Sequence, residues 1–323
     1  MAQSRPNVSS RSAGVGVLVA LVVSSSLAYI WPLTAVPFDP FRLNSNVLLG
    51  LVALTMFCLG LVVQSHELIE LQQRPLTVFL GVLVQCTLMP ALAWLVVRTL
   101  GLEGPLSYGV MLCGCVPGAM ASNVLTMTAR GNVSYSISLT SVATLLSPVT
   151  VPLALMIVAG LETGAEVFKP VKMATTLLLT VVMPVIAGYL IKERVATVAR
   201  FAKSAAPQIA TVALLWIIAS VVAGNRDRLS QVALSLLVGL LVMNLLGYLG
   251  GYGVGRVARM PDAMRRALTL EVGMQNAGLG TALAASLLGS DSLAQIPTAA
   301  YTFGCMLTGT LVAAVWAGKE RGV

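Results

Sequence analysis

A carboxylate within an apolar run has the clearest chemical consequence in this sequence. Glu271 lies in residues 267–280 (ALTLEVGMQNAGLG), and the amide pair Gln275 and Asn276 follows it. An unpaired charge at bilayer depth costs on the order of 3 kcal/mol, so such a group in an apolar helix is expected to have a functional partner. Carboxylate and amide oxygens are ligands that hard cations prefer. We therefore predict that Glu271 belongs to a sodium site.

A second polar interruption lies in residues 117–123 (PGAMASN). Pro117 removes a backbone donor and Gly118 lowers the cost of non-helical angles, so we expect the helix to unwind near Ala119–Asn123. The interruption at Glu271 contains glycines but no proline, and there we expect unwinding near Val272–Gln275. Unwound backbone at membrane depth is tolerated where it is buried in protein or lines a cavity, and its carbonyl oxygens can bind a cation.

Hydroxyl and amide side chains in other apolar runs add potential ligands. Ser136 and Thr140 are four residues apart and share one face of a predicted helix, which Thr144 continues. Gln85 is a strong amide in an otherwise apolar run, and Asn244 has the same character later in the chain. Taken singly, such groups more often bond to their own backbone or to a neighbouring helix. The charge of an ionised carboxylate such as Glu271, in contrast, needs more than one hydroxyl group to compensate it.

The composition indicates which elements must position these groups. Of the 323 residues, 57% are hydrophobic and 10% are charged, and apolar runs near the 20 residues that span a bilayer recur along the chain. We predict an all-α polytopic membrane protein, with residues 1–323 forming a single transporter domain. The ten predicted spans are 14–29, 47–63, 77–97, 107–128, 136–159, 173–191, 208–223, 232–254, 267–289 and 295–316.

The distribution of basic residues predicts the orientation in the membrane. Most of the 20 lysine and arginine residues lie in the N-terminal tail, the even-numbered loops and the C-terminus. The positive-inside rule then places both termini in the cytoplasm, as in a multi-pass protein of the inner (plasma) membrane. The net charge of +8 is explained in this way without a nucleic acid, and nothing indicates an obligate protein partner. Arg5 precedes a run without a convincing cleavage site, which we interpret as a retained first helix.

The chain divides into two similar halves, residues 14–159 and 173–316. A polar break lies in the fourth span of each half, and the third spans carry Gln85 and Asn244. Because each half has an odd number of spans, the second half must run through the membrane inverted relative to the first. Corresponding interrupted helices in two inverted halves indicate the central site of a transporter. We therefore predict that spans 4 and 9 are broken helices.

Two strings carry a resemblance to a known family. Residues 117–132 (PGAMASNVLTMTARGN) and 271–280 (EVGMQNAGLG) resemble the bile acid:sodium symporter family, and the similarity in span number extends over essentially the whole chain. The resemblance implies a panel domain of spans 1, 2, 6 and 7 and a core domain of spans 3–5 and 8–10. It also implies that the broken fourth and ninth helices cross, with two sodium ions behind the crossing.

The resemblance also implies the residues of each site. The ligands of the first sodium ion would be Ser122, Asn123, Ser136, Thr140 and Glu271. Those of the second would be Gln85, Glu271, Gln275 and the backbone carbonyls of Val272 and Met274. An organic anion would lie between core and panel, where helix N-termini offer unpaired N–H groups. The residues that we expect to face it are Asn276, Ala119 and Met120.

Two departures from the family pattern concern the substrate. Met120 stands where many bacterial relatives have threonine, and it cannot donate a hydrogen bond. Residues 301–305 (YTFGC) stand where many relatives have a His-Asn pair in the last helix. We therefore expect the substrate contacts of this chain to differ from those of such relatives.

The resulting hypothesis is a sodium-coupled symporter that imports an organic anion by alternating access. The resemblance implies a bile-acid-like compound, a steroid sulfate or a small carboxylate as substrate. A proton-coupled organic-anion carrier with Glu271 as the titrating group is the main alternative, and a channel or sensor is another. The sequence has none of the hydrolase motifs that place a nucleophile beside a base, so we do not expect an enzyme.

Overall fold

A computed structural model describes residues 9–33, 36, 38–63, 73–160, 169–229, 233–289 and 292–319. Arg5, which contributes to the predicted orientation, lies outside these residues. The first half contains α1 (Ser9–Ile30), η1 (Trp31–Leu33), α2 (Ser45–Val62), α4 (Pro75–Leu100), α5 (Gly104–Cys115), α6 (Ala121–Thr128) and α7 (Val133–Gly160). The second contains α8 (Pro170–Leu177), η4 (Leu178–Val182), α9 (Met183–Arg194), α10 (Ala196–Gly224), α11 (Arg226–Leu229), α12 (Leu234–Val257), α13 (Asp262–Gly273), α14 (Ala277–Leu288) and α15 (Gln295–Lys319).

The predicted fold class, an all-helical membrane protein, is confirmed. Seven helices in the described part of the chain are long and apolar enough to cross a membrane. They correspond to predicted spans 2, 3, 5, 6, 7, 8 and 10. Predicted span 1 matches α1, whose apolar part Val19–Ile30 is shorter, and spans 4 and 9 match the interrupted pairs α5–α6 and α13–α14. The number of crossings and the inverted repeat remain predictions.

The first interruption lies earlier in the chain than predicted. We expected unwinding near Ala119–Asn123, but α5 ends at Cys115 and α6 begins at Ala121, so that residues 116–120 are non-helical. The cause is the proline, because the residue before a proline is pushed towards extended angles. Val116 has φ −70° and ψ 156°, which ends the helix before Pro117 rather than after it.

The second interruption lies later than predicted. We expected unwinding near Val272–Gln275, but α13 continues through Gly273 and only residues 274–276 are non-helical before α14. No proline stops α13 here. Asn276 begins the next helix as its N-cap, since its Oδ1 accepts a hydrogen bond from the backbone N–H of Leu279 at 3.1 Å.

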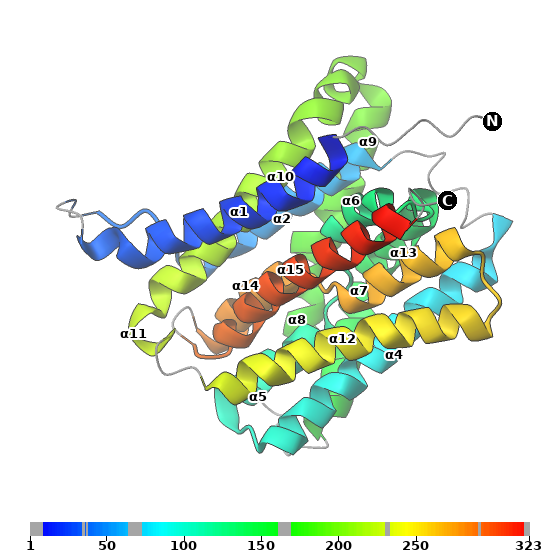
Figure 1. Cartoon of the computed structure of the whole chain (residues 1–323). Helices are drawn as coiled ribbons and strands as arrows, with labels where there is room; N and C mark the ends of the chain where they lie inside the picture. Colours follow the sequence, from blue (N-terminus) through cyan, green and yellow to red (C-terminus); the bar gives the residue numbers. More distant parts are fainter. Residues whose placement is uncertain are drawn as a thin grey trace.

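The helices pack as two groups of neighbours (Figure 1). In one group, α2 packs against α9 and α10, and α1 lies along α10. In the other, α12 packs against α4, α13 and α15, while α4 also contacts α5 and α7. The groups meet where α7 contacts α8 and where α14 contacts α2. The two interrupted helices both belong to the second group.

Glycines allow α12 to approach the helix that carries Glu271. A Cβ atom on Gly251 would lie 2.9 Å from the carbonyl oxygen of Leu268, and one on Gly247 would lie 3.2 Å from Cα of Gly273. Small residues at four-residue spacing permit this kind of close contact between membrane helices. The backbone of α12 therefore directly supports the end of α13.

Candidate cation site

The two non-helical segments cross and pair with each other. The backbone N–H of Ala119 donates to the carbonyl of Met274 at 2.8 Å, and the N–H of Asn276 donates to the carbonyl of Pro117 at 2.8 Å. Gly118 and Gln275 form an antiparallel bridge between them. Each break thus satisfies backbone groups that the other leaves without helical partners. We had expected these groups to be buried in protein, to line a cavity or to bind a cation, and the sequence did not indicate that the two breaks would pair with each other.

Glu271 is buried beside this crossing, with 1% of its surface exposed. Three hydroxyl groups donate hydrogen bonds to its carboxylate. Ser122 Oγ reaches Oε2 at 2.5 Å, Thr140 Oγ1 reaches Oε1 at 2.6 Å, and Ser136 Oγ lies 3.4 Å from Oε2. These donors come from α6 and α7, so three helices converge on one carboxylate.

The structure brings together all five residues predicted for the first sodium ion. Ser136 and Thr140 face the carboxylate from one side of α7, as their spacing indicated. Asn123 joins them, because its Oδ1 lies 3.4 Å from Thr140 Oγ1. Thr144, one turn further along α7, is buried but makes no such contact with the carboxylate.

The sequence interpretation missed one hydroxyl of this cluster. Thr126 is fully buried, and its Oγ1 donates to Ser136 Oγ at 3.3 Å. It follows Ser122 by four residues on α6, so the helical spacing that identified the hydroxyls of α7 could also have identified it.

The glutamines predicted for the second ion are buried with unpaired atoms. Gln85 on α4 is 2% exposed, and neither its amide nitrogen nor its amide oxygen has a hydrogen-bond partner among the described residues. Gln275 is 1% exposed; its Nε2 donates to the carbonyl of Val272 at 2.9 Å, but its Oε1 has no partner there. A buried polar atom without a partner costs about 1–3 kcal/mol and is uncommon in native proteins. Such oxygens are suited to an additional ligand.

Gly118 shows how closely these groups approach the crossing. A Cβ atom at this position would lie 2.2 Å from Glu271 Oε1 and 3.0 Å from Gln85 Nε2. Gly118 does not have a positive φ. The reason for a glycine here is therefore space for the carboxylate and the amide, whereas we had attributed it to the ease of non-helical angles.

The two backbone carbonyls predicted as ligands already accept hydrogen bonds. The oxygen of Val272 accepts from Gln275 Nε2 at 2.9 Å, and that of Met274 accepts from the N–H of Ala119 at 2.8 Å. Each carbonyl oxygen has two lone pairs, so one hydrogen bond leaves capacity for a cation.

The residues predicted to face a substrate lie at the same crossing and are half-buried: Ala119, Met120 and Asn276. Met120 packs both against the main apolar core and against a small apolar cluster formed by α2 and α10, so it lies where the two groups of helices meet. The Oδ1 atom of Asn276 is engaged in capping α14. Its amide nitrogen has no partner among the described residues.

The charge of Glu271 has no basic partner in the described part of the protein. The ion pairs found there are Lys192–Glu193, Arg226–Asp39 and Arg265–Asp262. A buried ionised carboxylate is strongly destabilising unless a positive charge compensates it. Because the surrounding groups are hydroxyl, amide and carbonyl oxygens, the compensating charge that fits best is a hard cation.

Comparisons with known proteins give the same class of function. A family model described as Sodium Bile acid symporter family matches residues 48–232. The uncharacterized sodium-dependent transporter YocS of Bacillus subtilis is 34% identical over 276 residues, which are 85% of this chain and 84% of that protein.

Two eukaryotic relatives are longer than this chain. The probable sodium/metabolite cotransporter BASS1 of Arabidopsis thaliana, a chloroplastic protein, is 28% identical over 82% of the chain and 65% of its own length. The human sodium/bile acid cotransporter 4 is 30% identical over 78% of the chain and 59% of its own length. The chain thus spans less than two thirds of each of these two relatives.

Proposed function

The chain belongs to the sodium bile acid symporter family, and on this basis we propose that it imports an organic anion together with sodium ions. It is a sodium-coupled membrane transporter and not an enzyme. The observation that carries the proposal is the buried carboxylate of Glu271, which three hydroxyls contact beside a crossing that holds the unpaired amide oxygens of Gln85 and Gln275, without a basic partner among the described residues.

Two sodium ions share this carboxylate in the proposed site. The first binds Ser122, Asn123, Ser136, Thr140 and Glu271. The second binds Gln85, Glu271, Gln275 and the carbonyls of Val272 and Met274. The convergence of α4, α6, α7 and α13 on Glu271 supports this assignment, because a cation can then tie four helices and both breaks together.

The helix groups suggest how the ions are coupled to movement. We assign α4–α7 and α12–α15 to a core domain and α1, α2, α8–α9 and α10 to a panel domain, with the two halves of the chain related as an inverted repeat. Rocking of the core against the panel would expose the crossing alternately to each side of the membrane. The ions bind first in this scheme, because they connect the two breaks that line the substrate position.

The substrate position lies at the crossing, on the side that faces α2 and α10. The N-terminus of α14 begins beside it, and the partial positive charge of a helix N-terminus favours an anionic group. Asn276 can offer its amide nitrogen to that group, and Met120 gives an apolar wall. A carboxylate or sulfate on an apolar body fits this combination, which includes bile-acid-like compounds, steroid sulfates and small carboxylates.

Two sodium ions and one monoanion would carry one net positive charge inward. A membrane potential contributes about 2.3 kcal/mol per charge per 100 mV, so import would be faster when the inside is negative. Import that is driven by an inside-negative potential agrees with a plasma-membrane protein whose termini face the cytoplasm.

Uptake by purified protein in liposomes tests the function. Labelled pyruvate, a bile salt and a steroid sulfate are each offered with an inward sodium gradient or an equal potassium gradient, for the native protein and for Glu271→Gln. We expect sodium-dependent uptake of at least one anion, its stimulation by an inside-negative potential, and its loss in the variant. Uptake driven by a pH gradient in sodium-free buffer would instead establish the proton-coupled alternative.

A further inference from the structure

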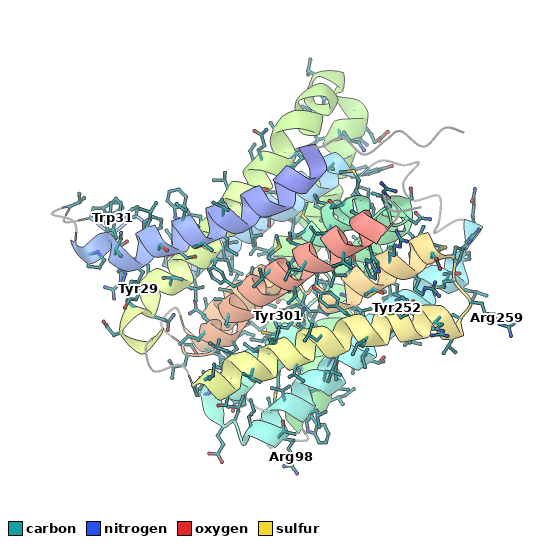
Figure 2. The ribbon with its side chains drawn as sticks, viewed as in Figure 1. Tyr29, Trp31, Arg98, Tyr252, Arg259 and Tyr301 are labelled. Atoms are coloured by element: carbon teal, nitrogen blue, oxygen red, sulfur yellow. The ribbon has the colours of Figure 1, made fainter. Side chains whose placement is uncertain are left out.

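The carbonyl of Gly273 is held by two side chains from other helices. Gly273 is the last residue of α13, where carbonyl groups lack intrahelical partners. Its oxygen accepts one hydrogen bond from Asn244 Nδ2 on α12 and another from the hydroxyl of Tyr301 on α15, both at 2.8 Å. Figure 2 shows Tyr301 on α15 where that helix lies beside α12. Three helices therefore meet at one carbonyl.

Both donors are buried, and the amide is anchored at its other end. Asn244 and Tyr301 are each 1% exposed. Thr308 Oγ1 lies 2.6 Å from Asn244 Oδ1, which accepts its hydrogen bond and fixes the orientation of the amide. Hydrogen bonds in a buried network of this kind reinforce one another and favour a single arrangement.

This carbonyl belongs to the segment that carries the proposed ligands of the second sodium ion. Gly273 lies between Val272 and Met274 and two residues after Glu271. Two hydrogen bonds saturate both lone pairs of its oxygen, so it cannot serve as a ligand itself. They also fix the plane of the peptide unit that joins Gly273 to Met274, and that orientation constrains the adjacent carbonyls.

The equivalent amide in the first half of the chain has the opposite environment. Gln85 lies in the third span of the first half and Asn244 in the third span of the second. Both are buried, but Gln85 has no partner among the described residues whereas Asn244 is paired through its nitrogen and its oxygen. The amide of Gln85 is thus available to bind a cation, whereas the amide of Asn244 is already hydrogen-bonded to the backbone.

We propose that Asn244 and Tyr301 are positioning residues that set the affinity of the second sodium site. They orient the peptide at Gly273 so that the carbonyls on either side of it, together with Gln275, face the ion. The proposal rests on the proposed function, because it assigns a role in the sodium site of that transporter. It adds two residues that do not contact the ion themselves but determine how well its ligands are oriented toward it.

Tyr301 and Tyr248 are buried tyrosines of the same hydrogen-bond network, and a phenylalanine substitution at each provides a matched test. Tyr301→Phe removes a donor to Gly273. Tyr248→Phe removes a buried hydroxyl that lies 3.2 Å from both the carbonyl of Cys305 and Thr308 Oγ1; it makes no bond to Gly273 and leaves Thr308 able to donate to Asn244. Thermal unfolding of each purified protein is followed while sodium chloride replaces choline chloride at constant ionic strength. The sodium concentration at half-maximal stabilisation is the readout.

We expect Tyr301→Phe to raise this concentration about fivefold to tenfold, as the loss of a buried hydrogen bond that aligns ligands predicts. Tyr248→Phe should lower the melting temperature in sodium-free buffer but leave the sodium midpoint unchanged. Asn244→Ser, which withdraws the other donor from Gly273, is measured in parallel and should shift the midpoint in the same direction. When Gln275→Ala has already removed a ligand of the second site, the added Tyr301→Phe change should produce no further shift.

The outcomes separate this inference from the proposed function. A normal sodium response of the native protein with unchanged midpoints in Tyr301→Phe and Asn244→Ser would overturn the inference and leave the function standing. Equal shifts in Tyr301→Phe and Tyr248→Phe would also overturn it, because the effect would then be general loosening. A native protein without sodium-specific stabilisation would overturn the proposed function, and the inference with it.

Discussion

Gly118 in the first broken helix lies directly against the carboxylate of Glu271 in the second, so that a Cβ atom on Gly118 would stand 2.2 Å from Oε1. The two halves of the chain therefore meet at the charged group itself, and not only through their helix packing. Because the neighbouring backbone is paired across the crossing, Gly118 cannot move away without breaking a bond between Ala119 and Met274. A change at this glycine should act first on the cation site.

Gly118→Ala should reduce stability and abolish the sodium-specific rise in melting temperature. The added methyl group has no room, so either the carboxylate or the paired backbone must shift. Thermal unfolding in sodium and in potassium measures both effects. Gly253→Ala on α12 is the control, because a Cβ atom there meets nothing within 4 Å. A sodium response that survives in Gly118→Ala would show that the carboxylate and this glycine are not coupled.

Gln85→Leu should separate stability from sodium binding. In sodium-free buffer the variant should be as stable as the native protein or more stable, because an unpaired buried amide is replaced by an apolar side chain of similar size. The sodium-induced rise should be largely lost. Asn244→Leu is the contrast, since it removes one of the two donors to the carbonyl of Gly273 and the side-chain acceptor of Thr308, and should cost about 1–3 kcal/mol without sodium. A strongly destabilised Gln85→Leu with an intact sodium response would contradict this division of roles.

The sequence predicted which side chains lie together better than it predicted the backbone that holds them, and their role as sodium ligands stays a prediction. Helical spacing placed Ser136 and Thr140 on one face, because an α-helix fixes which side chains share a face, and the family resemblance grouped them with Glu271, beside which they lie. The positions of both breaks were displaced by a few residues. Pro117 acts on the residue before it, and the break near Glu271 depends on a cap at Asn276.

Contacts between the two halves could not be derived from either half separately. The pairing of Ala119 with Met274 joins the two halves, and the hydrogen bonds from Asn244 and Tyr301 to the carbonyl of Gly273 join three helices within the second half. No local pattern distinguishes an asparagine that binds a distant carbonyl from a glutamine that remains unpaired. Asn244 and Gln85 have the same character in the sequence and opposite environments in the structure.

Thr140→Val should weaken the first sodium site without unfolding the protein. The change keeps the shape of the side chain but removes the hydroxyl that lies 2.6 Å from Glu271 Oε1. We expect the sodium concentration at half-maximal stabilisation to rise about tenfold or more, which corresponds to about 1.4 kcal/mol. Thr144→Val is the control on the same face of α7, one turn away from the carboxylate. Equal effects of the two substitutions would argue against a direct role for Thr140.

An ion pair at the end of α1 should make stability depend on pH. Arg226 Nη1 lies 2.7 Å from Asp39 Oδ2, and its guanidinium also donates to the carbonyl of Ala28. Burial by itself would raise the pKa of Asp39, but hydrogen bonds from Arg226 and from the N–H of Phe41, with the charges of Arg226 and Arg42, hold the pKa below its usual value. This end of α1 also carries Trp31, whose indole donates to the carbonyl of Phe38 at 2.8 Å (Figure 2).

A carboxyl whose pKa is lower in the folded state stabilises the fold above its unfolded pKa, about 3.9, and loses that contribution as the pH falls through the folded value. Asp39→Asn should therefore lower the melting temperature at neutral pH, and the difference from the native protein should shrink in strongly acidic buffer. Asp227→Asn is the control, because Asp227 is exposed and lies outside this ion pair. A difference that stays constant with pH would assign the effect to packing.

If Glu271 holds sodium, the melting temperature of the purified protein should be higher in sodium than in equimolar potassium. A ligand that binds only the native state stabilises it by about 2.7 kcal/mol at a hundredfold excess over Kd. We predict a sodium-specific rise for the native protein and none for Glu271→Gln, which keeps the size of the side chain but not its charge. Equal melting temperatures in the two salts, or a sodium-specific rise that persists in Glu271→Gln, would show that this carboxylate does not hold sodium.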